Sequence, residues 1–478
     1  MTFLLQFSRR GDIFIFAPTM SSHNRARIQP GWIRKLISRS NVASLLATRL
    51  PSLYYYYTRK DKQLFPSRIR SVDLSSFIDP SSHPNLNVII ITVDSLRNAN
   101  LSCTGYFRQT TPFLDSMNVR FKAISASPWT YPSVASLLTG LYPHNHGALL
   151  HGLVKNIGTD LDSYAPLRSH VVSLPEILHV LGYRIHFHTA IEMAYLPLRS
   201  RVIAHQYSPI EPAETLSRSL KRCIQRGDER QFVYLHLADL HSPLKIWHGT
   251  ILKIPNDYKE FFGRDENWQT MYDNALRYVD AAIERLFDYL SDSRLLDRTV
   301  VVITGDHGEE LGEHAELESA HFYDPRGSYG SGHGHNVFRE IIEVPLIFAG
   351  AVPAKVTDSL VSTVDVVPTV LDLIQVSHRF HFDGRSVFAN TDPKELRPLL
   401  CEACGYGYEK KALVVGHHKL IYSKEDGIEW VFNLNKDPLE RCPITDPQVT
   451  SPLLDMLQLI LREDERRRIR EAIRRTTV

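Results

Sequence analysis

An almost unbroken run of β-branched and other apolar residues, NVIIITVD at residues 87–94, constrains the fold more than any other feature of this sequence. A strand that is apolar on both faces has to be buried on both faces, which is typical of a parallel sheet covered by helices. Similar runs recur along the chain, and helical patterns separate them. We therefore predict an α/β fold with a doubly wound, mostly parallel sheet flanked by helices. The expected strands cover 87–94, 183–189, 231–237, 298–305 and 344–350, and the expected helices cover 110–118, 132–140, 173–181, 212–225 and 268–291.

The sequence pattern divides the chain into three parts. Residues 85–385 carry the alternating strands and helices of the α/β domain. Beyond about residue 385 short strand patterns flank a turn at residues 425–427, and an Arg-rich amphipathic helix closes the chain. This sequence pattern predicts a small antiparallel sheet and a helix over residues 386–478. Residues 1–80 form an N-terminal extension.

The N-terminal extension is strongly basic. Residues 1–70 hold 13 lysines and arginines against two acids, which leaves +11 on this part and −9 on the rest of the chain. Apolar and basic residues are interleaved in WIRKLISRSNVASLLATRL, so this part either packs on its own domain, forms an arm, or makes peripheral contact with an anionic membrane surface. We expect no nucleic-acid partner.

The lack of a recognisable targeting signal and the small, odd number of cysteines indicate a cytoplasmic protein. The opening MTFLLQFSRRGDIFIFAP interrupts its apolar runs with charges and lacks a small-residue cleavage site, and no stretch reaches the length of a membrane span. The five cysteines are sparse and odd in number, which is typical of reduced thiols. Cys401 and Cys404 form a lone CxxC, which without a second pair is a weak zinc signal.

Candidate metal ligands follow two of the expected strands. Asp94 ends the first strand, and Asp306 and His307 follow the strand at 298–305. In an open α/β sheet, ligands bind outside the carboxyl ends of the strands. Two carboxylates and one imidazole suit several divalent cations, so we predict a metal site at this edge, although each acid alone also fits a turn or a helix cap.

A candidate nucleophile lies in the stretch SPWTYPSVASLLTG, residues 127–140. Pro132 suits the first turn of a helix and Gly140 its end, so Thr130 is expected at the positive end of this helix. A hydroxyl there is either a helix cap or a nucleophile. The residues around Thr130 decide between the two.

Further candidates are three histidines and an arginine near the same sheet edge. His241, in a turn after the strand at 231–237, could serve as a proton donor, whereas His236 within that strand is interpreted as an interior histidine. His333 and His335 lie in the glycine-rich loop DPRGSYGSGHGHNVF and could meet the charge of an anionic substrate. Arg97 is a further candidate for substrate binding.

Eight blocks in order along the chain resemble those of the sulfatase family within the alkaline phosphatase superfamily. The resemblance covers about residues 86–435 and rests on NVIIITVDSLR, TTPFLDSM, SPWTYPSVASLLTGLYPHNHG, LHLADLHSPL, YVDAAIERLFDYL, TGDHGEELGEH, GHGHNVFREIIEVPLIF and VDVVPTVLDL with FDGRS. It implies an alkaline phosphatase-like catalytic domain over 85–385. It also implies a role for each candidate: metal ligands Asp94, Asp306, His307 and Thr130; nucleophile Thr130; a histidine at the leaving group, His241; and substrate-binding or catalytic residues His333 and His335.

The chain also departs from the family pattern. Ser95 replaces the second acid that the family commonly has beside the first, and Val134 stands where the signature has arginine. Typical sulfatases oxidise a Cys or Ser at the nucleophile position to formylglycine. Thr130 carries a methyl group on Cβ, so the same oxidation would give a ketone, and we expect no formylglycine. The family suggests calcium, whereas a histidine ligand with one acid fewer also admits manganese or zinc.

These features predict a metal-dependent, sulfatase-like hydrolase that cleaves a sulfate, phosphate or phosphonate ester through a covalent Thr130 intermediate. The expected substrate is a small-molecule, glycan-linked or lipid-linked anionic ester. One alternative is a transferase of the same fold that passes a phospho-group to an alcohol; the absence of membrane spans disfavours it. The other is a degenerate member that binds an anion without turnover, which the departures at Ser95 and Val134 favour and the retained Asp94, Thr130, Asp306 and His307 oppose.

Overall fold

The computed structural model describes most of the chain from residue 73 onward. The described residues are 4–7, 13–16, 73–82, 84–150, 163–199, 201, 205–207, 213–224, 229–241, 261–263, 267–354, 359–389 and 395–476.

The core of the fold is an eight-stranded sheet with the strand order β12-β4-β11-β8-β3-β7-β5-β6. The NVIIITV run forms β3 (Asn87–Val93) near its centre, parallel to both β7 (Gln231–Leu237) and β8 (Thr299–Gly305). These strands are buried almost throughout, as their apolar, β-branched composition requires. The other strands are β4 (Val119–Ile124), β5 (Arg184–Thr189), β6 (His205–Tyr207), β11 (Glu343–Gly350) and β12 (Val361–Ser362).

The mostly parallel, doubly wound arrangement is confirmed, with one reversal. β11 runs antiparallel to both β8 and β4, whereas β12 is again parallel to β4. The pattern identified β11 as a strand but could not give its direction, because a strand buried on both faces looks the same in either orientation. β4 is a further strand, and the sequence pattern did not predict it. Its alternating apolar and polar residues, VRFKAI, are typical of a strand toward the edge of a sheet.

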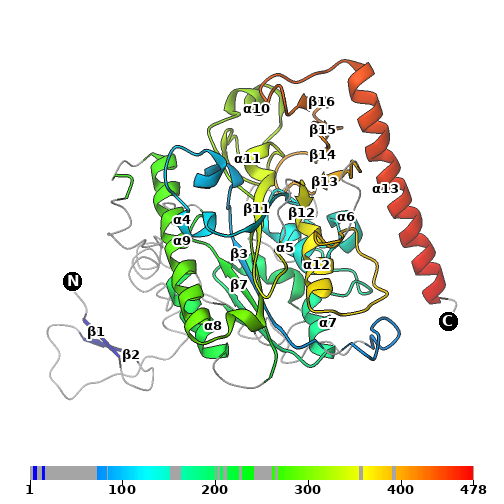
Figure 1. Ribbon diagram of the computed structural model, residues 1–478. Coiled ribbons are helices and arrows are strands. Elements are labelled where there is room, and N and C mark those ends of the chain that lie inside the picture. Colours follow the sequence, from blue (N-terminus) through cyan, green and yellow to red (C-terminus); the bar gives the residue numbers. More distant parts are fainter. Residues whose placement is uncertain are drawn as a thin grey trace. The chain divides into compact units, whose positions relative to one another are not determined.

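Helices cover both faces of the sheet (Figure 1). The period-two alternation of β3 sends Val88 and Ile90 into one hydrophobic core and Ile89, Ile91 and Val93 into the other. Helices α5, α7 and α12 contribute to the first core and α4, α8 and α9 to the second. Their bounds are α4 (Pro112–Asp115), α5 (Thr130–Thr139), α7 (Leu174–Val180), α8 (Ala213–Ile224), α9 (Trp268–Asp292) and α12 (Val366–Leu373).

Shorter elements connect these layers. They include the short helices α6 (Pro143–His146), α10 (Ala315–His321) and α11 (Arg339–Ile342), and the two-stranded sheet of β9 (Glu310–Leu311) and β10 (Ser331–Gly332). Among the described residues, 3-10 helices form at Asn98–Asn100, Ser102–Thr104, Glu192–Ala194, Leu196–Leu198, Leu296–Arg298 and Thr363–Asp365.

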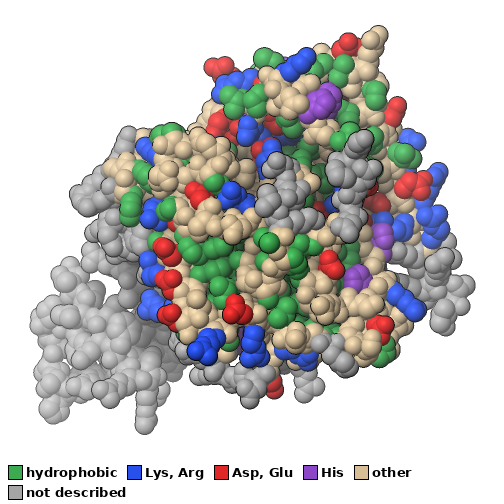
Figure 2. Space-filling view, in the orientation of Figure 1, with side chains coloured by type: hydrophobic (Ala, Val, Ile, Leu, Met, Phe, Trp, Pro, Cys, Tyr) green, Lys and Arg blue, Asp and Glu red, His purple; other side chains and the backbone are tan. Residues whose placement is uncertain are grey.

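The expected C-terminal sheet and helix are present. Four antiparallel strands form a meander, and α13 (Pro447–Thr476) packs on it through the buried Leu457. Figure 2 shows charged side chains of both signs along the edge where α13 runs in Figure 1, which agrees with its Arg-rich composition. The strands are β13 (Leu399–Cys401), β14 (Lys411–Val415), β15 (His418–Ser423) and β16 (Ile428–Asn433).

The chain separates into two units: residues 1–64 with 244–252, and residues 65–243 with 253–478. In the first unit β1 (Leu4–Phe7) pairs antiparallel with β2 (Ile13–Phe16). Apart from residues 73–80, the rest of the N-terminal extension lies outside the described residues, so its expected membrane contact stays a prediction, as do the boundaries at 80 and 385. In the part of the chain that the structure describes, no helix combines the length and the apolar character needed to cross a membrane.

Candidate active site

Strand register brings the two predicted acids together. Val93 of β3 pairs with Gly305 of β8, so Asp94 and Asp306 leave neighbouring parallel strands at the same edge of the sheet. Both side chains are fully buried. The edge is the carboxyl end of the strands, as expected for a doubly wound sheet.

Thr130 is the first residue of α5, and its side chain does not cap the helix. The capping position belongs to Trp129, and no side chain accepts a hydrogen bond there. Thr130 Oγ1 instead lies 3.4 Å from Oδ2 of Asp94 and 3.2 Å from Nε2 of His307. The Ser133 hydroxyl, one turn along α5, donates to the backbone carbonyl of Asp306 and ties the helix to the end of β8. The N-terminal end of α5 adds partial positive charge at this point.

The donor atoms of Asp94, Asp306 and His307 lie within 4.8 Å of one another, close enough to bind one metal ion. His307 Nε2 is 3.6 Å from Oδ1 of Asp94 and 3.5 Å from Oδ2 of Asp306. Nδ1 of the same ring donates to the carbonyl of Gly308 at 2.8 Å, so Nε2 is the ring nitrogen that faces the carboxylates. Two carboxylates, one imidazole nitrogen and a hydroxyl therefore fit a divalent cation.

Charges within this group shift its pKa values. Burial opposes ionisation of Asp306, yet the neighbouring His307 and His236 hold the pKa of Asp306 below its usual range. Burial also disfavours the charged form of His307, but Asp306 and Asp94 raise its pKa. The two carboxylates thus create a strongly negative pocket that attracts positive charge.

His236 belongs to the same group, although the sequence analysis interpreted it as an interior histidine. Its Nε2 lies 3.5 Å from Oδ2 of Asp306 and 3.8 Å from Oδ2 of Asp94. The side chain is fully buried, so the burial that the strand pattern indicated is correct. Its place in the group follows from the pairing of β7 with β3, which puts His236 beside Thr92, two residues before Asp94.

Ser95 and Glu309 connect the metal-ligand group to a histidine. The Ser95 hydroxyl bonds Oδ1 of Asp94 at 3.1 Å and Oε2 of Glu309 at 2.9 Å. Ser95 has a left-handed backbone with φ 62°, which is strained for a residue other than glycine. Glu309 was not among the predicted site residues. Its position three residues after Asp306 in GDHGEELGEH was the available signal.

Two of the predicted histidines line up with His307. Nδ1 of His333 donates to Oε2 of Glu309 at 2.6 Å. The ring centroids of His307 and His333 are 4.2 Å apart, and those of His333 and His241 are 5.1 Å apart. Burial lowers the pKa of His333, while Glu309 opposes this shift. The rings of His241, His333 and His307 therefore form a row in which each neighbours the next, and His307 also contacts Thr130.

His335 is not part of this row of imidazole rings. It lies in a second buried group, where its Nε2 is 3.1 Å from Oε1 of Glu318. Burial and the charge of Glu318 raise the pKa of Glu310, in the same group, to about 9. Although burial opposes it, the hydrogen bond and charge of His335 lower the pKa of Glu318 to about 2.

Arg97 is the other candidate that the structure places apart. Its Nη2 forms an ion pair with Oε1 of Glu313 at 2.5 Å, and its backbone N–H donates to the hydroxyl of Tyr272. Among the described residues, its hydrogen bonds and ion pairs include no member of the Asp94 group.

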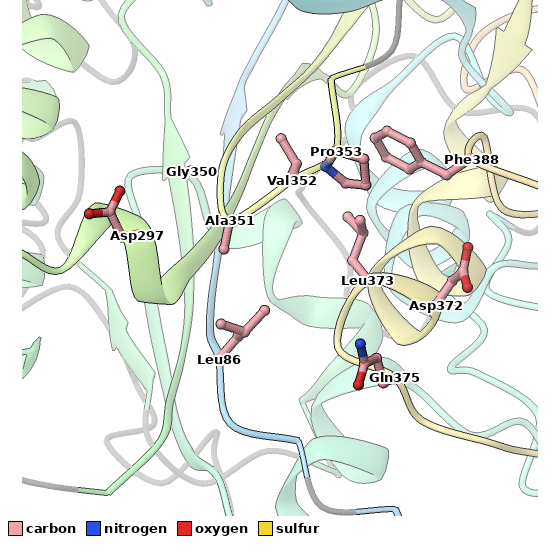
Figure 3. Close-up of a pocket in the computed structure, with 10 residues that line it drawn as sticks. All are labelled: Leu86, Asp297, Gly350, Ala351, Val352, Pro353, Asp372, Leu373, Gln375 and Phe388. Carbon is pink, nitrogen blue, oxygen red and sulfur yellow. The ribbon is translucent and has the colours of Figure 1, made fainter.

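A pocket of about 530 Å³ lies at the opposite edge of the sheet (Figure 3). It lies beside the start of β3 and the end of β11, with Leu86, Gly350, Val352 and Phe388 among its lining residues. None of the predicted site residues lines it. This pocket is therefore separate from the Thr130 group.

Comparisons with known proteins identify relatives of this chain. The family described as Sulfatase matches residues 86–376. The chain is 23% identical over 362 residues to the extracellular sulfatase SULF-1 homolog of Drosophila melanogaster, covering 63% of this chain and 31% of the relative. It is 26% identical over 314 residues to the low-salt glycan biosynthesis sulfotransferase Agl7 of Haloferax volcanii, covering 65% of this chain and 66% of that protein. These matches thus span less than two thirds of either relative.

The fold is also that of solved structures. The phosphonate monoester hydrolase of Agrobacterium radiobacter superposes with a TM-score of 0.58 at 15% identity, covering 79% of this chain and 95% of that one. It shares the alkaline phosphatase-like α/β architecture, with a mixed main sheet, flanking helices and a small separate sheet. With the family match extending over more than half of its length, the chain belongs to the sulfatase family.

Proposed function

We propose that this protein is a metal-dependent ester hydrolase in which Thr130 is the nucleophile. The observation that carries the proposal is the position of the Thr130 hydroxyl, 3.4 Å from Asp94 and 3.2 Å from His307, at the start of a helix that it does not cap. A threonine that only stabilised the helix would direct its oxygen to the backbone N–H groups of α5.

Asp94, Asp306, His307 and Thr130 would hold the cation, since their donor atoms converge and Nε2 is the nitrogen of His307 that faces the two carboxylates. A divalent cation bound there lowers the pKa of a coordinated hydroxyl and offsets negative charge on the ester oxygens. With an imidazole and only two acids, manganese and zinc fit this donor set at least as well as calcium, the ion that family resemblance suggests.

In the first step Thr130 attacks the central phosphorus or sulfur atom. A bond forms from Oγ1 to that atom, the bond to the ester oxygen breaks, and the hydroxyl proton of Thr130 leaves to solvent. The departing alcohol oxygen takes a proton from a histidine. Nδ1 of His333 already donates to Glu309, which leaves Nε2 of His333 as an acceptor, so His241 is the better proton donor.

In the second step water frees Thr130. The water oxygen forms a bond to the central atom, the bond between that atom and Oγ1 of Thr130 breaks, one proton of the water passes to Oγ1, and the phosphate, phosphonate or sulfate anion departs. Threonine cannot form the aldehyde of formylglycine, so it cannot expel sulfate by collapse of a hydrated aldehyde. A second displacement at the central atom is required, and this requirement favours phosphate or phosphonate esters over sulfate esters.

The alcohol part of the substrate is proposed to be a glycan, a lipid or a small molecule. The relative from Haloferax volcanii is named for glycan biosynthesis, which favours a glycan-linked ester. That same name favours a second candidate function, transfer of the anionic group from Thr130 to an acceptor alcohol instead of water.

Intact-mass analysis tests the nucleophile. Full-length protein is incubated with divalent metals and p-nitrophenyl phosphate, p-nitrophenyl phenylphosphonate or p-nitrophenyl sulfate, and both nitrophenol release and protein mass are measured. Wild-type protein should turn over a phosphorus ester and show a covalent adduct on rapid acid quench. Thr130→Ala should abolish both signals.

Thr139→Ala is the matched control. Thr139 lies on the same helix and is also buried, but its hydroxyl bonds the carbonyl of Ala135 within α5. This variant should keep activity and adduct. Undiminished turnover by Thr130→Ala would refute the nucleophile. A product formed on an added acceptor alcohol, in place of free phosphate, would favour the transferase.

A further inference from the structure

A second group of buried ligand-type side chains lies outside the Thr130 site. Glu310 comes from β9, Glu318 from α10, and His335 from the loop after β10. Each offers one ligand atom, and these atoms lie within 4.8 Å of one another. All three residues are buried. The proposed chemistry of Thr130 uses none of them.

The spacing of these atoms resembles that of the Thr130 site. Nε2 of His335 lies 3.1 Å from Oε1 of Glu318 and 3.8 Å from Oε2 of Glu310. Ligand atoms that each lie about 2.1 Å from one tetrahedral cation are about 3.4 Å apart. A cation therefore fits between the three side chains with small adjustments.

The carboxylates of this group have only histidines as possible cationic partners among the described residues. Neither Glu310 nor Glu318 forms an ion pair with a lysine or arginine among the described residues; their ion-pair partners are histidines. The remaining donors are neutral: the backbone N–H of His314 to Glu310 at 2.7 Å and that of Gly330 to Glu318 at 2.5 Å. Buried carboxylates are normally paired with cationic groups or coordinate metals.

Asn336 lies against the same three side chains. Its Oδ1 accepts from the backbone N–H of Phe338 at 2.9 Å, which fixes Nδ2 toward Glu310, Glu318 and the His335 ring. Nε2 of His335 thus faces an N–H donor at 3.2 Å as well as the carboxylates. Nδ2 can donate its two hydrogens to the carboxylates of Glu310 and Glu318, so it does not need the lone pair of Nε2, which stays available to a cation.

We propose that Glu310, Glu318 and His335 bind a second divalent cation, with zinc as the first candidate. Three protein ligands with one imidazole and a water molecule form a usual zinc environment, whereas calcium takes six to eight oxygen ligands. Asn336 then acts as the outer partner that orients the two carboxylates.

The second cation would stabilise the loop that presents His333. Glu310 directly follows Glu309, the hydrogen-bond partner of His333, and it pairs with Gly332 across β9 and β10. His335 lies two residues beyond His333. A cation bound at this position therefore joins β9, α10 and the His333 loop without contacting the substrate.

Zinc content of the full chain tests this proposal. Wild-type protein and variants are loaded with zinc, passed through a desalting column, and analysed by inductively coupled plasma mass spectrometry. Wild type should hold two zinc ions per chain, and Glu318→Gln and Asp306→Asn should each hold one. Zinc affinity at the second site should fall at least about 100-fold in Glu318→Gln, because loss of an outer partner alone costs 10- to 100-fold.

The control is Glu316→Gln, on the same helix but exposed, which should hold two ions. The retained first-site ion and a native circular dichroism spectrum report folding of Glu318→Gln, and His335→Gln replaces it if it does not fold. Equal zinc content in wild type and Glu318→Gln would overturn the second site and would mean that Glu310 and Glu318 share a proton. Failure of the Thr130 mechanism would appear separately, as turnover by Thr130→Ala.

Discussion

Glu309 holds His333 through a 2.6 Å hydrogen bond from Nδ1 of the ring to Oε2 of the carboxylate. The same oxygen also accepts from Ser95, whose hydroxyl reaches Asp94. Glu309 thereby connects the orientation of a candidate catalytic histidine to that of a metal-ligand carboxylate. It acts as a positioning residue, since its contacts are with side chains that touch the site.

Glu309→Gln should lower kcat by about 10- to 100-fold with little change in KM, because an amide can no longer hold the ring through a charged acceptor. The ester panel described above measures both constants, with the pH profile of kcat as a second readout. Glu316→Gln again serves as the control. An unchanged kcat and pH profile would contradict the positioning role.

Ser95→Gly should be more stable than Ser95→Ala by about 1 kcal/mol. Both variants lose the hydroxyl and its bonds to Asp94 and Glu309, so their difference isolates the backbone. Ala keeps the strain of the left-handed conformation at φ 62°, and Gly removes it. Urea denaturation of the two variants measures the difference. An Ala variant as stable as the Gly variant would show that the turn is not strained.

Stability should fall between pH 6.5 and pH 9 because of His144. Burial opposes its charged form, but Glu402 and Asp464 raise its pKa to about 9. A folded-state pKa above the unfolded value of about 6.5 stabilises the fold fully below pH 6.5, and this contribution is lost as pH rises through 9. The loss should reach up to about 3 kcal/mol.

The measurement for His144 is a comparison of wild type with His144→Gln by urea denaturation at pH 6.5 and pH 9. Other groups titrate equally in both proteins, so the stability difference reports His144. That difference should be large at pH 6.5 and shrink at pH 9. A difference that is constant with pH would exclude the linkage.

Leu457→Ala should reduce the free energy of unfolding by about 2–5 kcal/mol, since the leucine is 1% exposed in the core that α13 shares with the C-terminal sheet. Leu459 on the same helix is 58% exposed, and its substitution by Ala should change stability by no more than about 0.5 kcal/mol. Thermal or urea unfolding of the two variants provides the test. Equal losses would mean that α13 does not pack through Leu457.

The sequence by itself determined the α/β class and the strands that position the site. The NVIIITVD run and the run before Asp306 had to be buried strands, and acids at their ends had to lie at one edge of a parallel sheet. The ordered blocks also determined the sulfatase family. These features can be inferred from short stretches of sequence, because the pattern of a buried strand and the start of a helix depend on residues close together in the chain.

Tertiary structure alone decided which side chains meet. His333 and His335 are two residues apart in one loop, yet His333 pairs with Glu309 and His335 with Glu318. In an irregular loop, side chains two residues apart can point in opposite directions, and no sequence periodicity predicts the direction of each one. The same holds for His236, whose burial followed from its strand but whose contact with Asp306 depended on how β7 and β8 flank β3.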